Sequence, residues 1–252
     1  LDERLLATPS LALERSRGVA AELAERSVRA LKNALLCVTK YSSALAASVQ
    51  QDESDCDHYE DILGTYLVKL SACKLSETES EEATELLKTI GDFERISDHA
   101  VNILKSAEEL REKKLSFSAS AQTEFDTLSA AINEILDLSL ESFTHDDVTV
   151  AAQVEPLEQV IDTLKEQMRT RHILRMQQGH CSIAAGFVWS DLLTNLERTS
   201  DHCSNIAGCV IDTAQHNLNL HETLSAVKHG DGAFRHSFER YAEKYRLPYE
   251  VA

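Results

Sequence analysis

The chain has 252 residues, which is long enough to bury one large hydrophobic core or two smaller ones. It contains only 8 Gly and 3 Pro, with 6% aromatic residues, a composition that suits long helices and supplies little turn material for a sheet. A formal charge of −17 argues against a nucleic-acid backbone or an anionic membrane surface as a partner and favours the attraction of cations.

Three long helices are predicted in the first part of the chain. Pro9 suits the first position of a helix that follows Thr8 as its cap. A polar run then separates the first helix from the second. Ser76, with Glu79 three residues later, is a capping-box signature that begins the third helix. The predicted ranges are 9–50, 51–73 and 76–112.

The same pattern then restarts. Three further helices are predicted at 117–145, at 147–178 with a bend near Pro156, and at 181–217, with a turn at Gly179 and His180. We therefore predict an all-α fold of tandem three-helix bundles. The expected divisions are a first bundle at 1–114, a second at 115–217, and a C-terminal tail at 218–252 that is either a docking helix or a mobile terminus.

Ten residues of the third helix return in the sixth. Glu94-Arg-Ile-Ser-Asp-His-Ala-Val-Asn-Ile reappears as Glu197-Arg-Thr-Ser-Asp-His-Cys-Ser-Asn-Ile, with seven of the ten residues identical. The offsets 197 − 94, 201 − 98 and 205 − 102 all equal 103. A repeat of this length is too long for one solenoid unit, so it indicates duplication of a small bundle.

Both copies of the repeated helix carry an apolar stripe at steps of three and four residues, the pattern of a core-facing helix surface. In the third helix the stripe consists of Leu86, Ile90, Phe93, Ser97, Ala100, Leu104 and Ala107. In the sixth it consists of Trp189, Leu193, Leu196, Ser200, Cys203, Ala207 and Val210.

Acidic residues four positions apart form a second row beside each stripe, one helical turn apart on one face. The helix before each repeat supplies another such pair, and antiparallel neighbours would bring the two rows face to face. In the first bundle the row residues are Glu94, Asp98 and Asn102 with Glu53 and Asp57. In the second they are Glu197, Asp201 and Asn205 with Glu158 and Asp162.

Facing carboxylates repel one another unless protons or cations lie between them. Oxygen ligands of this kind suit hard ions, so we expect divalent or trivalent metal ions, with iron, Mn, Mg and Zn as candidates. Two other interpretations remain open: an ordinary solvated surface, or a salt-bridge lattice in which Arg95 and Arg198 pair with the acids. His99 and His202 follow the acids directly and are expected at a surface or an interface.

Other features give weaker indications. The six cysteines form no CxxC pair and are expected to be reduced core residues. No apolar run approaches the ~18 residues of a membrane-spanning helix. The chain begins at Leu1 without Met, so we expect it to be a piece of a longer protein.

The repeated segment resembles the PhoU family, in which duplicated three-helix bundles carry E(D)xxxD motifs. Ser97 and Ser200 stand where Gly is common in that family. The resemblance implies metal clusters on the bundle surface, often of iron. It implies Glu94, Asp98, Glu197 and Asp201 as the main ligands, with the acids of the preceding helices matched less securely.

The two ends of the chain extend the resemblance. The segment 1–14 is similar to the stretch that follows the membrane domain in bacterial sodium/phosphate cotransporters of the type II family, and 241–248 is similar to their C-terminus. The implied protein is a PhoU-like domain at the cytoplasmic face of the inner membrane. Its implied partners are the membrane domain of the same transporter and, as an open alternative, a second copy of itself.

We therefore expect a non-catalytic domain that regulates sodium-dependent phosphate uptake. It is expected to bind inorganic phosphate only through a bound metal ion. A scaffold without metal is one alternative. A carboxylate-metal enzyme is another, although such di-iron bundles use Glu-x-x-His spacing with inward ligands, and His99 and His202 lie five residues after the glutamates.

Overall fold

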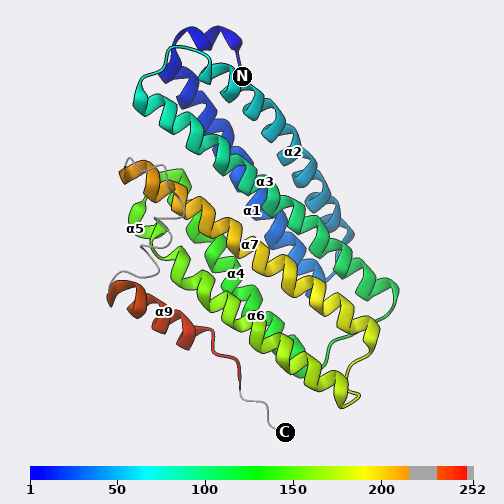
Figure 1. Ribbon diagram of the computed structural model, residues 1–252. Helices are drawn as coiled ribbons and strands as arrows, with labels where there is room; N and C mark the ends of the chain where they lie inside the picture. The colour runs from blue at the N-terminus through cyan, green and yellow to red at the C-terminus, as the bar shows by residue number, and fades with distance from the viewer. Residues whose placement is uncertain (216–231, 249–252) are drawn as a thin grey trace.

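The computed structural model describes residues 1–215 and 232–248, and these form helices with no strand among them. The long helices run side by side along one direction, as Figure 1 shows. In chain order they are η1 (Glu3–Ala7), α1 (Pro9–Thr39), α2 (Ser43–Ser71), α3 (Glu77–Glu112), α4 (Ala119–His145), α5 (Val148–Ala151), α6 (Val154–Gln177), α7 (Ile183–Gln215) and α9 (Gly232–Lys244).

The first predicted helix boundary is wrong. Helix α1 ends at Thr39 rather than near Gln50, and 51–55 lies inside α2 instead of between helices. Lys40 and Ser42 adopt extended backbone angles that separate α1 from α2. No Gly or Pro marks this turn, and the apolar spacing continues through it, so periodicity alone does not reveal the break.

The other boundaries are close to the predicted ones. Ser76 and Glu79 form the predicted capping box at the start of α3, and Pro9 occupies the start of α1, although the Thr8 side chain makes no capping bond there. The break in the fifth helix precedes Pro156, because α5 ends at Ala151 and Pro156 lies in the first turn of α6, where no intrahelical N–H bond is lost. The predicted end of the sixth helix, 216–217, lies outside the described residues.

The helices form two groups that meet along α3 and α7. Helices α1, α2 and α3 pack together, as do α4, α6 and α7. In Figure 1, α3 and α7 lie side by side between α2 on one flank and α6 on the other. Every residue of the two predicted core stripes is buried, which confirms that the repeat keeps the same packing surface in both copies.

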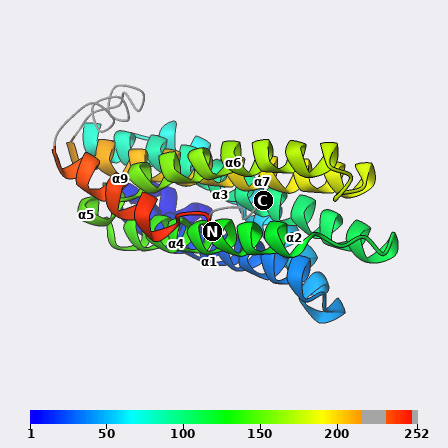
Figure 2. The same cartoon turned by 90° about the horizontal axis from the view of Figure 1, so that it is seen from below.

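The C-terminal tail forms a docked helix. Helix α9 lies against α4 and α6 (Figure 2), and Tyr241, Tyr245 and Leu247 bury their side chains there. Lys244 pairs with Glu134 of α4 at 2.7 Å. Of the two alternatives left open for the tail, the docking helix is observed at 232–244, and residues 216–231 lie outside the described residues.

Candidate functional site

The first acidic row lies between α2 and α3. Burial and the neighbouring Asp98 raise the pKa of Glu94 to about 6, and Glu60 and Asp57 of α2 contribute in the same direction. Burial, Asp98 and Asp57 likewise raise the pKa of Glu53 above its ordinary value. The two predicted pairs of this bundle therefore do face one another, and the carboxylates share one region of negative charge.

Arg95 lies across this row. Its guanidinium donates to Asp98 at 3.0 Å and lies 3.6 Å from Glu94, so the salt-bridge arrangement that we left open is present here. The Arg95 side chain is 62% exposed, and exposed pairs of this kind contribute little to stability. The pKa of Glu94 is raised even though Arg95 acts to lower it. The single arginine therefore does not neutralise the acids of this row.

The second acidic row, between α6 and α7, is more nearly neutral. Lys165 of α6 forms a salt bridge with Glu197 at 2.9 Å. We had considered Arg198 as the salt-bridge partner of the acids in this row. Burial, Glu197 and Asp162 raise the pKa of Asp201, against a smaller opposing effect of His202 and Lys165. Glu197, Asp201 and Asp162 are thus brought together, with a lysine among them.

The remaining predicted residues are placed differently. Glu158 is buried rather than on an open row. Asn102 is exposed on α3, whereas the amide of Asn205 donates to Asp92 at 3.3 Å and so belongs to the contact between the repeats. Of the two acids on the helix preceding the second motif, Asp162 raises the pKa of Asp201.

A polar layer joins the two repeats and was not anticipated in detail. His202 donates to Asp92 at 2.8 Å, and His99 donates to Asn195 at 2.9 Å. These two bonds are equivalent under the repeat, because 195 − 92 and 202 − 99 both equal 103. The histidines therefore lie at the interface between the repeats, which is one of the two locations that we expected for them. Each histidine directly follows an acid of a row.

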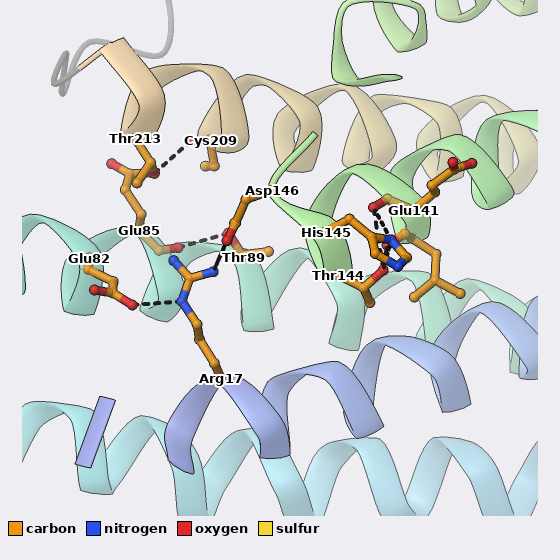
Figure 3. Close-up of polar contacts among 11 residues, drawn as sticks. Arg17, Glu82, Glu85, Thr89, Glu141, Thr144, His145, Asp146, Cys209 and Thr213 are labelled. Atoms are coloured by element: carbon orange, nitrogen blue, oxygen red, sulfur yellow. Dashed lines mark hydrogen bonds and ion pairs between the residues drawn. The ribbon is translucent and has the colours of Figure 1, made fainter. Parts of the chain in front are cut away.

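Another polar cluster, shown in Figure 3, links the bundles through Arg17 of α1. Arg17 donates to Glu82 of α3 at 2.6 Å and to both carboxylate oxygens of Asp146 at 2.8 Å. Asp146 ends α4 with a φ of 51°, a left-handed conformation that aspartate tolerates better than most residues. This cluster fastens the end of α4 to the first bundle and contains none of the predicted site residues.

The acidic rows have the donor chemistry that a hard cation requires. Within residues 1–215 and 232–248, however, no three His, Cys, Asp or Glu side chains converge closely enough to hold one metal ion. In the first row the carboxylates would have to turn inward and displace Arg95 from Asp98. Burial, and after it the neighbouring carboxylates, raises the pKa of Glu53 and of Glu94, so the charged forms are disfavoured there and a cation would stabilise them.

Comparison with known proteins identifies the family. The model of the PhoU domain matches residues 20–107 and 125–210, one match in each half of the chain. This chain belongs to the PhoU family. The two matched segments contain Glu94 and Asp98 in the first and Glu197 and Asp201 in the second, so both repeated motifs lie inside PhoU-like sequence.

Curated relatives agree with this assignment. The chain is 28% identical over 145 residues to the phosphate-specific transport system accessory protein PhoU homolog 1 of Thermotoga maritima, covering 58% of this chain and 61% of that protein. It is 26% identical over 125 residues to a PhoU homolog of Deinococcus radiodurans, covering 48% and 56%. The chain thus spans less than two thirds of the length of these relatives.

Solved structures share the fold. PhoU from Pseudomonas aeruginosa has a TM-score of 0.69 at 21% identity, covering 86% of this chain and 100% of that one. The phosphate transport system regulatory protein PhoU from Streptococcus pneumoniae has a TM-score of 0.72 at 17% identity, covering 84% and 99%. Among the described residues, no helix is long and apolar enough to cross a membrane.

Proposed function

We propose that this PhoU-family chain is a non-catalytic regulatory domain of phosphate transport that acts through cation binding at its acidic rows. The relatives from T. maritima and S. pneumoniae carry names that assign them to phosphate transport systems as accessory and regulatory proteins. The observation that carries the cation step is the gathering of four acids between α2 and α3, namely Glu53, Asp57, Glu94 and Asp98. Burial and these neighbours raise the pKa of Glu94 to about 6, although Arg95 lies beside it.

The first row would hold the ion through Glu53, Asp57, Glu94 and Asp98, and the second through Asp162, Glu197 and Asp201. A bound iron, Mn, Mg or Zn ion would supply positive charge and open coordination positions for phosphate oxygens. Without such an ion the carboxylates repel phosphate. Phosphate sensing by these rows therefore depends on the cation.

Coupling to the rest of the molecule follows from the position of the rows. Asp98 is followed by His99 and Asp201 by His202, so each row adjoins the polar layer between α3 and α7. Carboxylates that turn inward toward α2 and α6 would pull on the same helices whose contact joins the repeats. Two packings of the bundles with different cation affinities would then respond to ion and phosphate concentration.

The partner in this proposal is a phosphate transporter. The likeness of both chain ends to sodium/phosphate cotransporters supports a membrane domain of the same protein, which would place the domain at the cytoplasmic face of the inner membrane. Copurification of the full-length gene product with a membrane fraction, and its release as this domain on limited proteolysis, would test that arrangement. A full-length product without a membrane segment would contradict it.

Phosphate binding with and without metal tests the proposed function. We expect calorimetry to detect phosphate binding in the presence of Mn²⁺ or Fe³⁺ and none after chelation. Asp98→Asn combined with Asp201→Asn should abolish it. Asp126→Asn is the matched control, because Asp126 is an exposed acid of α4 that accepts a hydrogen bond from Gln122. Equal phosphate affinity with and without metal would contradict the proposal.

A scaffold that works without metal is the second candidate. It is favoured by the cationic side chains already within the rows, Arg95 at 3.0 Å from Asp98 and Lys165 at 2.9 Å from Glu197. A scaffold should retain regulation of phosphate uptake in the Asp98→Asn, Asp201→Asn double variant. The cation-dependent regulator should lose it.

A further inference from the structure

A groove lies between α6 and α7, near the turn that connects them, and adjoins the second acidic row, because Glu197 and Lys165 are among its lining residues. Its volume is about 560 Å³. The buried residues His172, Trp189 and Leu193 line its floor, and the exposed residues Met176, Ile183 and Phe187 stand at its rim. The turn between α6 and α7 is the yellow-green end of the molecule in Figure 1.

The rim is unusually apolar for a surface. Ile183 is 75% exposed, Phe187 is 68% exposed, and Ile173 across the groove is 43% exposed. Large apolar side chains gathered on one surface mark an interaction site. The equivalent positions in α3 are Ser80 and Thr84, since 183 − 103 is 80 and 187 − 103 is 84. The apolar rim is therefore a feature of the second repeat alone and does not follow from duplication of the bundle.

The floor offers unused polar atoms. The Nε2 atom of His172 and the Nε1 atom of Trp189 are buried and have no hydrogen-bond partner, and both residues line the groove. Buried polar groups are normally bonded, so two unbonded nitrogens in residues that line one hollow are exceptions to this rule. Burial and Arg175 lower the pKa of His172, which keeps its imidazole neutral near pH 7.

One end of the groove is basic. Arg169 and Arg198 lie there together with Lys165, whose charge is already matched by Glu197. The Arg169 side chain is 68% exposed, and its nearest carboxylate, Glu166, lies 3.9 Å away. In a chain with a formal charge of −17, two exposed arginines beside an apolar hollow form a local exception. An occupant with acidic groups at this end would complement them.

The bundle already accepts a helix in the neighbouring position. Helix α9 fills the surface between α4 and α6 with Tyr241 and Tyr245, while Arg171 holds its end through the carbonyl of Pro248 at 2.9 Å. The α6–α7 groove has the same form, two antiparallel helices with an apolar trough between them. In the described part of the chain, no helix other than α6 and α7 contributes to its lining.

We propose that this groove docks an amphipathic helix of a partner protein, with apolar side chains between Phe187 and Ile173 and acidic side chains against Arg169 and Arg198. This is the helix-in-groove mode of recognition, in which residues at every third and fourth position serve as anchors. The concave shape fits a helix better than a flat bilayer, and the negative charge of the whole chain disfavours an anionic membrane. The proposal does not depend on cation binding.

A designed peptide tests this surface. The probe is a helical peptide of about 18 residues with leucines at every third and fourth position and glutamates in its first turn. A second peptide carries lysines in place of the glutamates. We expect the glutamate peptide to bind the native chain more tightly than the lysine peptide does. The glutamate peptide should bind Phe187→Glu and Arg169→Glu at least about tenfold more weakly than it binds the native chain. Val68→Glu on α2, where the native valine is 60% exposed, is the matched control and should bind normally.

Three results would overturn the proposal. The first is equal binding of the two peptides to the native chain, and the second is unchanged binding of the glutamate peptide to Phe187→Glu. The third is that the glutamate peptide does not bind, whereas the native chain binds phosphatidylcholine–phosphatidylglycerol vesicles and Phe187→Glu does not. The last would assign the surface to a membrane. The three substituted residues, Phe187, Arg169 and Val68, are exposed, so the thermal transition suffices to check folding. Metal-dependent phosphate binding should be unchanged in Phe187→Glu.

Discussion

The imidazole rings of His99 and His202 lie 5.6 Å apart across the contact between α3 and α7. Each histidine bonds the residue seven positions before the other, since 99 − 92 and 202 − 195 both equal 7. The arrangement relates the two repeats by approximate two-fold symmetry. One difference between the repeats is that Asp92 in the first corresponds to Asn195 in the second.

That difference predicts which substitutions the layer tolerates. Asp92→Asn should change the free energy of unfolding by less than about 1 kcal/mol, because Asn195 already performs the equivalent role for His99. Asp92→Ala should cost about 1–3 kcal/mol, since His202 and Asn205 would both lose their acceptor. Urea unfolding of the three proteins measures this. A larger loss for Asp92→Asn than for Asp92→Ala would contradict the assignment.

The raised pKa of Glu94 predicts a pH dependence in metal-free protein. The pKa is 4.5 for an ordinary glutamate and about 6 in the fold, so the native state holds the proton more tightly. The contribution of Glu94 to stability is therefore most favourable below about pH 4.5 and is lost as the pH rises through about 6. Glu94→Gln should remove this fall and stabilise the protein at pH 7 by about 1 kcal/mol, after allowance for solvent screening.

Thermal unfolding at pH 4.5 and pH 7 in the presence of a chelator provides the measurement. The advantage of Glu94→Gln should disappear at the lower pH. Asp137→Asn is the control, because this residue is 61% exposed and pairs with Lys32 far from the row. A destabilising effect of Glu94→Gln at pH 7 would show that the row is not a region of excess charge.

Glu124, a buried acid of the second bundle, should cost much more to remove than an exposed acid. Glu124 is fully buried and accepts hydrogen bonds from Arg175 at 2.8 and 2.9 Å and from Arg171 at 3.3 Å. Glu124→Ala leaves Arg175 buried without its counter-charge, so we expect a loss of about 3–5 kcal/mol. Asp137→Ala, which breaks an exposed pair, should cost less than about 1 kcal/mol. Comparable losses in the two variants would contradict this account.

Thiol reactivity tests the packing of the bundles. Cys37, Cys56, Cys203 and Cys209 are buried, whereas Cys73 and Cys181 are half-buried. Burial raises the pKa of Cys56 and of Cys203 to about 12, so neither forms the reactive thiolate at neutral pH. An aromatic disulfide reagent should therefore titrate two thiols in the native protein and six after unfolding. Rapid reaction of Cys203 in native protein would show a loosely packed second core.

Much of the fold could be predicted because the duplicated segment constrains it. The shared apolar stripe of α3 and α7 fixes their buried faces, and the polar residues of ERxSDHxxN fix which flank carries the acids. The break at 40–42 escaped prediction, because Leu45 and Val49 continue the apolar spacing beyond it and Ser42 makes no side-chain cap.

The site was less predictable, because it depends on how neighbouring helices are placed against one another. Glu158 and Glu53 look alike in sequence, yet Glu158 is buried and Glu53 faces Asp98. The pairing of His202 with Asp92 spans 110 residues and requires knowledge of the α3–α7 contact. One signal was present in the sequence: Asp92 and Asn195 are polar residues at equivalent positions two residues before the repeated segment.

Anomalous diffraction from crystals grown with Mn²⁺ and without chelator tests the central claim most directly, because it locates ions rather than inferring them. We predict an anomalous peak between α2 and α3, within bonding distance of Glu94 and Asp98, with Arg95 turned away from Asp98. A map with no peak there and Arg95 still bonded to Asp98 would contradict cation binding by the acidic rows.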